Sequence, residues 1–419
     1  MKSGRKGRYP NGLVSNMARS TDRDFTHGKH IDIMVGDCVE SMKSLPDKSV
    51  QTCITSPPYW GLRDYGHEEQ LGMEKTPEEF VANMVEVFRE VKRVLRDDGT
   101  LWLNLGDSYA SGKARYSTKE QSFLGGKRND AKLGALQDGK RACVKHHDYL
   151  KDKDLVGIPW LVAFALQRDG WWLRQDIIWH KPNPMPESVK DRCTKSHEYI
   201  FLLTKSPTYY YDDEAVKIPV NDPTRKNYQS GARTNGLNLD RNDNDFGERM
   251  KGVIFDKKKK RSVWSVKVKP FKEAHFATYP PELIEPCVLA STSEHGCCAE
   301  CGAPYVREIK TTYPKMRGIE ARDVPGQNKH GSFGATRFDD PIVTETTGWK
   351  PSCDCNAEIS RCTVLDPFGG SGTTGAVALK HGRKAILCEL NEEYAKIIPK
   401  RIESITGLSA TQKTFDDWW

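Results

Sequence analysis

The chain has 419 residues, of which 37% are hydrophobic and 29% are charged, a balance typical of a globular protein with long polar insertions. The net charge of +7 favours a polyanionic partner only where the cations cluster. The sequence has no apolar run long enough to span a bilayer and no signal-peptide core, so we expect a cytoplasmic protein with no membrane partner. In that compartment, twelve cysteines predict thiols or metal ligands rather than disulfides.

The first predicted elements alternate between strand and helix. Ile31–Val35 is predicted to be a strand, and Asp37 has the position and residue type of a cap for a helix over Val39–Lys43. A second apolar strand begins at Val50. Alternation of this kind predicts a layered α/β protein.

The second strand ends in the string Thr55-Ser56-Pro57-Pro58-Tyr59-Trp60. Two prolines impose an extended backbone and donate no N–H to a ladder, so nearby carbonyl oxygens are left without partners. The Ser56 hydroxyl and the Pro57 carbonyl would accept the two hydrogens of an exocyclic amine, and Tyr59 would stack on the ring that bears it. Taken alone, the string is also typical of a proline turn with surface aromatics.

A long amphipathic helix is predicted next. Thr76 is a good N-cap, Pro77 occupies the first helical position and Glu79 completes a capping box. The apolar stripe runs to Leu95, and Gly99 is predicted to end the helix. The elements predicted after it are a strand over Thr100–Leu105, a helix over Leu155–Arg168, and strands over Trp171–Trp179 and Glu198–Leu203.

A polar segment rich in cations follows over residues 212–262. It contains Arg225, Arg233, Lys258, Lys259, Lys260 and Arg261. Consecutive cations of this kind would neutralise several phosphates, although a solvated charge run is the commoner explanation.

Near the C-terminus, the string DPFGGSGTT (Asp366–Thr374) lies between a predicted strand over Thr363–Leu365 and a predicted helix over Gly375–Lys380. A glycine-rich turn in this place lets a ligand approach the backbone closely, and the absence of a following Lys excludes a P-loop. Glu389 ends another predicted strand about 20 residues later, a spacing that suits a carboxylate on ribose hydroxyls. The pattern fits a dinucleotide or any adenosine cofactor.

A cysteine cluster precedes this loop. Cys298 and Cys301 form a C-x-x-C-Gly string, and Cys353 and Cys355 form a C-x-C pair, with Cys297 and Cys362 as spare candidates. Four thiolates would complete a tetrahedral zinc site. The irregular spacing leaves a structural zinc ion and free reduced thiols as alternatives.

In this order, TSPPYW and DPFGGSGTT resemble the S-adenosylmethionine-dependent DNA amino-methyltransferases in their permuted beta arrangement, in which the catalytic motif precedes the cofactor motif. The likeness covers most of Ile31–Leu203 and His275–Glu403. It implies a doubly wound, Rossmann-like α/β sheet whose cofactor motif is C-terminal, with S-adenosylmethionine as cofactor. The cofactor-binding residues predicted are Asp37, Thr55, Tyr279, Asp366, Phe368, Gly369, Gly370, Ser371, Gly372, Thr373, Thr374 and Glu389.

The resemblance also assigns roles. It implies that Asp37 reaches the adenine of the cofactor and that the segment containing Tyr279 packs beside its methionine end. Lys181 belongs to a segment similar to the family's W-x-K-x-N-x-x-P signature. The predicted catalytic residues are Ser56, Pro57, Pro58 and Tyr59, and the predicted DNA contacts are Lys181, Arg225, Arg233, Lys258, Lys259, Lys260 and Arg261.

The predicted reaction is methyl transfer to an exocyclic base amine by base flipping and direct displacement. Within the resemblance, S-P-P-Y is mostly found in cytosine-N4 enzymes and D-P-P-Y in adenine-N6 enzymes, so cytosine N4 is the predicted target and adenine N6 the alternative. Methylation at cytosine C5 would need a nucleophilic cysteine, and the Pro286-Cys287 pair falls inside a predicted helix over Glu282–Ala290.

Two hypotheses of other kinds remain. One is a nucleic-acid-binding protein with a vestigial cofactor fold, which the intact motifs disfavour. The other is a small-molecule amine methyltransferase, which leaves the basic insertions unexplained. The expected partner is double-stranded DNA, with a cognate restriction endonuclease as a further candidate and a monomer or homodimer as the assembly.

The predicted organisation has a catalytic half and a cofactor half separated by insertions. Its parts are a basic tail (1–29), the catalytic half (30–211, with an insertion at 108–153), a target-recognition segment (212–262), a cofactor-side helix region (263–296), a cysteine-rich insertion (297–361), the cofactor half (362–405) and a C-terminal tail (406–419).

Overall fold

The computed structural model describes residues 31–61, 70–110, 147–219, 257–268, 278–312 and 342–407, all within one compact unit. Among these residues, no helix is long and apolar enough to cross a membrane. The predicted basic tail, most of the insertion at 108–153, and Arg225 and Arg233 lie outside the described ranges.

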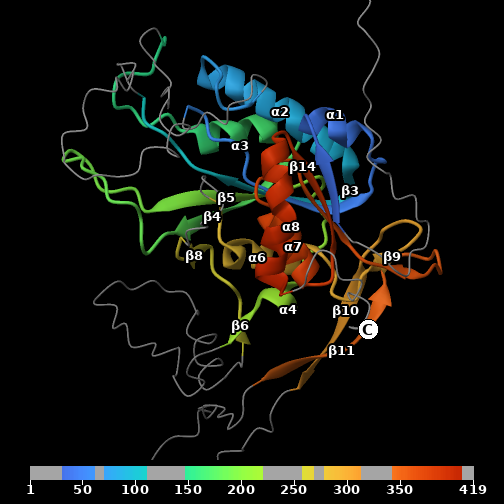
Figure 1. Cartoon of the computed structure of the whole chain (residues 1–419). Helices are drawn as coiled ribbons and strands as arrows, with labels where there is room; N and C mark the ends of the chain where they lie inside the picture. The colour runs from blue at the N-terminus through green and yellow to red at the C-terminus, as the bar shows by residue number, and fades with distance from the viewer. Residues whose placement is uncertain are drawn as a thin grey trace, which may run out of the picture. The chain divides into compact units, whose positions relative to one another are not determined.

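Eight strands form one mixed sheet in the order β1-β14-β13-β2-β3-β5-β4-β8 (Figure 1). The first five run parallel, β5 pairs antiparallel with both β3 and β4, and β8 runs parallel to β4. The strands are β1 (Ile31–Val35), β2 (Val50–Thr55), β3 (Leu95–Leu105), β4 (Trp172–His180), β5 (His197–Thr204), β8 (Val263–Ser265), β13 (Thr363–Asp366) and β14 (Lys384–Glu389). Strands from near the C-terminus therefore lie between β1 and β2, which confirms the predicted doubly wound, permuted α/β fold.

Helices cover both faces of this sheet (Figure 1). Helices α1 (Cys38–Lys43), α2 (Pro77–Val94) and α3 (Ile158–Arg168) contribute to one apolar cluster, and α4 (Asp213–Val216), α6 (Pro281–Ser291) and α7 (Thr373–Lys380) contribute to another. Helix α8 (Glu392–Thr406) packs on α7 and β14 through Ile398 and Ile402. Burial of both sheet faces explains why β2 is buried along its whole length.

Among the described residues, three small two-stranded ladders lie outside the large sheet. They are β6 (Ile218–Pro219) with β7 (Lys257–Lys258), β9 (Cys297–Cys298) with β12 (Ile359–Ser360), and β10 (Tyr305–Thr312) with β11 (Val343–Pro351). The last two belong to the described part of the cysteine-rich insertion.

The predicted end of helix α2 is wrong, although its start is confirmed. Thr76 accepts a hydrogen bond from the Glu79 N–H and Pro77 is the first residue of the helix. The helix ends at Val94 rather than at Gly99, because Leu95 adopts an extended conformation and pairs with Val50 of β2. Sheet pairing with complete burial of the Leu95 side chain outweighs its helical spacing.

Two other helices refine the predictions. Helix α3 begins at Ile158 rather than Leu155, because Gly157 adopts φ +84° and occupies the cap position. Helix α6 contains Cys287, whose side chain is fully buried and whose thiol pKa is raised by that burial. A thiol in this setting is not a nucleophile, which agrees with the exclusion of C5 chemistry.

Candidate functional site

A cavity of about 580 Å³ opens at the carboxyl ends of the parallel strands. Its walls come from the segments that follow β1, β2, β3, β13 and β14, together with residues 179–198 between β4 and β5. Ligands of open α/β sheets bind at this edge, where the strand order reverses. Here the reversal falls between β13 and β2, one from each predicted half of the chain.

Most of the predicted catalytic and cofactor-binding residues share this cavity, together with one predicted DNA contact, Lys181. Those that line it are Asp37, Ser56, Pro57, Pro58, Tyr59, Lys181, Tyr279, Phe368, Gly369, Gly370, Ser371, Thr373 and Glu389. Thr55, Asp366, Gly372 and Thr374 are not among the lining residues. Residues more than 300 positions apart in the sequence therefore line the same cavity.

Asp366 is a buried carboxylate behind the cavity wall. Its carboxylate accepts hydrogen bonds from the Thr55 hydroxyl at 2.6 Å, the Thr374 hydroxyl at 2.5 Å, the Tyr279 hydroxyl at 3.2 Å and the Phe368 N–H at 3.0 Å. Burial raises the pKa of Asp366, although these donors oppose that effect. The network ties the end of β2 to the end of β13 and holds the glycine-rich loop that follows β13 at Phe368 and Thr374.

The glycine-rich loop takes conformations that favour glycine. Gly370 has φ +52° and Gly372 has φ +83°, in the left-handed region. A Cβ at Gly372 would lie 2.6 Å from Ile398 Cγ2, so only glycine lets helix α8 pack this closely. At Gly370, by contrast, the atom nearest to an added Cβ would be the Phe368 carbonyl oxygen, 3.9 Å away. The backbone of Gly370 is therefore open to a ligand.

Glu389 holds this loop from the end of β14. One carboxylate oxygen accepts from the Gly370 N–H at 2.7 Å and the other from the Asn391 N–H at 2.9 Å. Burial raises the pKa of Glu389 to about 7 despite these bonds. Each oxygen has a second lone pair, so the carboxylate can still accept hydrogen bonds from hydroxyl groups of a ligand.

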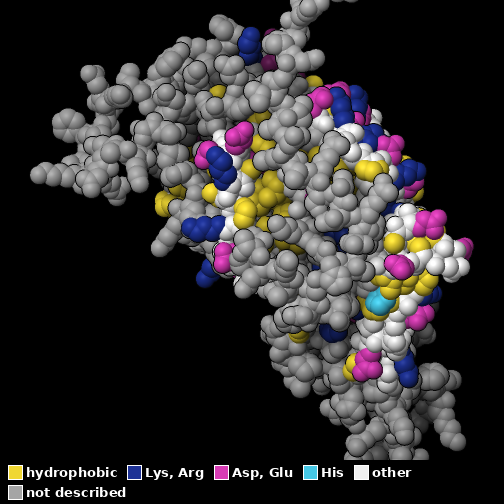
Figure 2. Space-filling view, turned by 45° about the vertical axis from the view of Figure 1, so that its right-hand side comes forward, with side chains coloured by type: hydrophobic (Ala, Val, Ile, Leu, Met, Phe, Trp, Pro, Cys, Tyr) yellow, Lys and Arg dark blue, Asp and Glu magenta, His cyan; other side chains and the backbone are white. Residues whose placement is uncertain are grey.

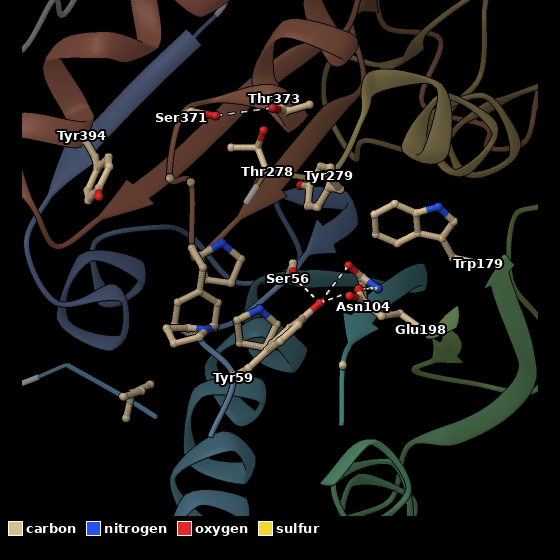
Figure 3. A pocket seen from close by; sticks show the side chains of 18 of the residues that line it. Ser56, Tyr59, Asn104, Trp179, Glu198, Thr278, Tyr279, Ser371, Thr373 and Tyr394 are labelled. Carbon is tan, nitrogen blue, oxygen red and sulfur yellow. Dashed lines mark hydrogen bonds between the residues drawn. The ribbon is translucent and has the colours of Figure 1, made fainter. Parts of the chain in front are cut away.

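The predicted catalytic string forms another part of the cavity (Figure 3). The Tyr59 hydroxyl donates to Glu198 Oε2 at 2.8 Å and lies 3.3 Å from Asn104 Oδ1. The Ser56 hydroxyl lies 3.5 Å from the Tyr59 hydroxyl. Ser371 and Thr373 of the glycine-rich loop lie apart from this group in the same view, as does Tyr394. Two separate groups of polar side chains therefore line the one cavity.

Gly106, just past the end of β3, determines where the Tyr59 ring lies. A Cβ on Gly106 would lie 2.5 Å from Tyr59 Cε2, closer than carbon atoms can approach. The absent side chain lets the ring lie close to the backbone of Gly106. Glycine here serves close approach, since Gly106 is not among the positive-φ residues.

Glu198 was not predicted from the sequence. It joins Tyr59 and Asn104 through one oxygen and forms an ion pair with Lys181 through the other. Lys181, predicted as a DNA contact, therefore lies in the cavity wall, with its ammonium 4.3 Å from the centre of the Trp179 ring. No motif marks Glu198, and only its place at the start of a strand beside the Lys181 segment hinted at this role.

The predicted run of cations lies at the sheet edge beside β8, outside the cavity. Lys258, Lys259 and Arg261 are exposed, whereas Lys260 is half-buried with its ammonium 4.7 Å from the centre of the Trp264 ring. Lys259 also lies 3.6 Å from Asp213. On the face drawn in Figure 2, cationic and anionic side chains alternate, so cations of the described residues do not dominate that face.

The four cysteines predicted as metal ligands lie outside the cavity. The sulfur atoms of Cys298, Cys301, Cys353 and Cys355 all lie within 4.8 Å of one another. The spare candidates Cys297 and Cys362 are not part of this group and instead contact each other in the buried interior.

Comparison with known proteins gives consistent matches. The family described as DNA methylase, of the N6/N4 type, matches residues 50–299 and 358–400. The type II methyltransferase M.Cfr9I of Citrobacter freundii is 39% identical over 88% of this chain and 86% of its own length. M.SmaI of Serratia marcescens is 36% identical over 88% and 90%. Among solved structures, the cytosine-N4-specific PvuII DNA methyltransferase aligns over 91% of this chain and 93% of its own, at 15% identity and a TM-score of 0.48.

Proposed function

The chain belongs to the N6/N4 DNA methylase family, and on that premise we propose that it transfers a methyl group from S-adenosylmethionine to the N4 amine of cytosine in duplex DNA. The observation that carries the proposal is the meeting of two groups in one cavity. Ser56, Pro57 and Tyr59 supply the amine site, and the glycine-rich loop with Glu389 supplies the cofactor site.

The residues present fit an adenosine cofactor. Glu389 offers carboxylate lone pairs to ribose hydroxyls, the Gly370 backbone is open to close approach, and Asp37 lines the same cavity while capping α1. S-adenosylmethionine supplies an electrophilic methyl carbon on a sulfonium. Tyr279 lies beside this loop, fixed by its hydrogen bonds to Asp366 and Thr374.

The chain's own contribution to the reaction is placement. An exocyclic amine shares its lone pair with the ring, so both N–H groups must be held for that pair to point at the methyl carbon. The Ser56 hydroxyl and the Pro57 carbonyl accept these hydrogens, and the Tyr59 ring supports the base from one side. Alignment at near-attack distance then supplies much of the rate, and a base in duplex DNA must first be flipped out.

The target base is proposed from the residue at position 56. A serine hydroxyl is a neutral acceptor, whereas an aspartate at this place would offer full negative charge. Within the family, S-P-P-Y is the string mostly found with cytosine N4. Adenine N6 remains the second candidate, since it presents the same amine geometry to the same acceptors.

We further propose that a restriction endonuclease with the same recognition sequence accompanies this chain. The support is that its relatives are type II methyltransferases. DNA methylated by the chain should then resist that endonuclease.

Ser56→Ala tests the amine site. We expect the methyl-transfer rate to fall about 5- to 150-fold, because an unmade hydrogen bond at a buried polar group costs about 1–3 kcal/mol. S-adenosylmethionine affinity, measured by calorimetry, should stay near wild type. Mass spectrometry of nucleosides from DNA treated with the wild-type protein should show N4-methylcytosine. If only N6-methyladenine is found, the target base is adenine instead. If no DNA sequence yields a methylated nucleoside, the proposed function is refuted.

Cofactor binding should strengthen as the pH rises through the pKa of Glu389. Below about pH 7 the carboxyl group is protonated, and its O–H occupies an oxygen that the loop N–H groups and the ribose need as an acceptor. Between about pH 6 and about pH 8 the ionised fraction grows roughly tenfold, and the association constant should follow it. Calorimetry across this range tests the prediction, and Glu389→Gln should show a flat profile. A wild-type affinity independent of pH would contradict it.

A further inference from the structure

The cysteine-rich insertion contains a cluster of potential metal ligands outside the methyl-transfer cavity. Cys298 and Cys301 lie in a tight turn that begins in β9, where the Gly302 N–H donates to the Cys298 carbonyl at 2.8 Å and Gly302 adopts φ +71°. Cys353 and Cys355 come from the loop between β11 and β12, and β12 pairs with β9.

The sulfur atoms are already close to the spacing of a metal site. All four lie within 4.8 Å of one another, whereas thiolates around tetrahedral zinc lie about 3.8 Å apart, from a Zn–S bond of about 2.3 Å. All four cysteines are free rather than disulfide-bonded. Small side-chain rotations would complete the site.

The strands described in the insertion, β9, β10, β11 and β12, contribute no residue to the three apolar core clusters. The β10–β11 hairpin is largely exposed over both its strands. A small segment without its own core usually needs disulfides or a metal to hold its shape.

We propose that Cys298, Cys301, Cys353 and Cys355 bind one structural zinc ion. Four thiolates with no open position are the closed coordination set of a structural zinc site, and the cluster lies outside the cavity. The proposal does not depend on the methyl-transfer assignment.

The zinc site braces the seam between the two halves of the large sheet. Gly302, next to Cys301, presents its carbonyl to Gln51 Nε2 at 3.1 Å, and Gln51 Oε1 accepts from the Thr363 N–H at 2.6 Å. Arg96 of β3 donates to the Cys301 carbonyl. Gln51 and Thr363 lie near the starts of β2 and β13, whose other ends carry the Thr55–Asp366 hydrogen bond. The metal-bound turn therefore supports the register that aligns the cavity from the opposite end of the same strands.

The test begins with metal content. Full-length protein purified without chelator should contain about one zinc per chain by elemental analysis. Replacing zinc with cobalt should give the absorption bands of a tetrahedral cobalt–thiolate site. Removing the metal should lower the Tm and raise the number of thiols that react with a thiol reagent under native conditions.

Variants locate the site. Cys298→Ser and Cys301→Ser should lose the metal, and Cys355→His should retain it, because imidazole is also a zinc ligand. Cys193→Ser is the control, since Cys193 is exposed and outside the cluster. If a cysteine variant fails to fold, the metal content and cobalt spectrum of the wild type still decide. Folded protein without metal, iron in place of zinc, or full zinc content in Cys298→Ser would overturn the proposal.

Discussion

Replacing Tyr59 with alanine is expected to lower kcat/KM for methyl transfer to duplex DNA by about 5- to 150-fold. Stacking of a base on an aromatic side chain is worth about 1–3 kcal/mol, and the flipped base would lose this surface entirely. The ring can take its position because Gly106 has no side chain, and the hydrogen bond from the Tyr59 hydroxyl to Glu198 keeps it there. Rates measured at several DNA concentrations would separate weaker base capture from slower chemistry.

Tyr59→Phe is the matched control. It keeps the ring and removes only the hydroxyl, with its bonds to Glu198 and Asn104, so a loss much smaller than that of Tyr59→Ala is expected. Gly106→Ala should lower the rate as Tyr59→Ala does although Tyr59 itself is unchanged, because the added Cβ would displace the tyrosine ring. Equal losses in Tyr59→Phe and Tyr59→Ala would show that the hydroxyl, and not stacking, is what matters.

Glu389→Ala is expected to weaken S-adenosylmethionine binding by about 10- to 150-fold or more. Loss of a hydrogen bond to a charged group costs about 1.5–3 kcal/mol, and the substitution also leaves the Gly370 and Asn391 N–H groups without their acceptors. The glycine-rich loop, which we propose faces the cofactor, would then lose its support together with the proposed ribose contact. Calorimetry of the purified variant measures the affinity directly.

A nearby acid provides the comparison for this variant. Glu392→Ala removes the same charge three residues later, on the exposed first turn of α8, and should bind the cofactor like the wild type. A thermal melt without ligand distinguishes loop damage from lost contact. Unchanged affinity in Glu389→Ala would remove Glu389 from the cofactor site, whatever its effect on the melt.

The sequence by itself determined the local elements and the family. Strands β1 and β2 have the predicted bounds, because runs of apolar residues closed by Gly36-Asp37 and by two prolines leave little choice. The start of α2 followed from Thr76 and Pro77, which act within one helical turn. The order of the two motifs predicted the permuted fold, since each motif belongs to a known place on the sheet. The roles of the individual site residues stay predictions.

The tertiary structure decided what depends on partners distant in the chain. Leu95 is not part of helix α2 because it pairs with Val50 of β2. Asp366 lies behind the cavity wall because its carboxylate accepts hydrogen bonds there from Thr55, Thr374 and Tyr279. Glu198 joined the site through Tyr59, 139 residues away, and the two cysteine pairs met through the pairing of β9 with β12. Local sequence patterns record only contacts within a few residues. Sheet pairing fixes the remaining contacts, because it brings together side chains whose separation along the chain carries no periodic signal.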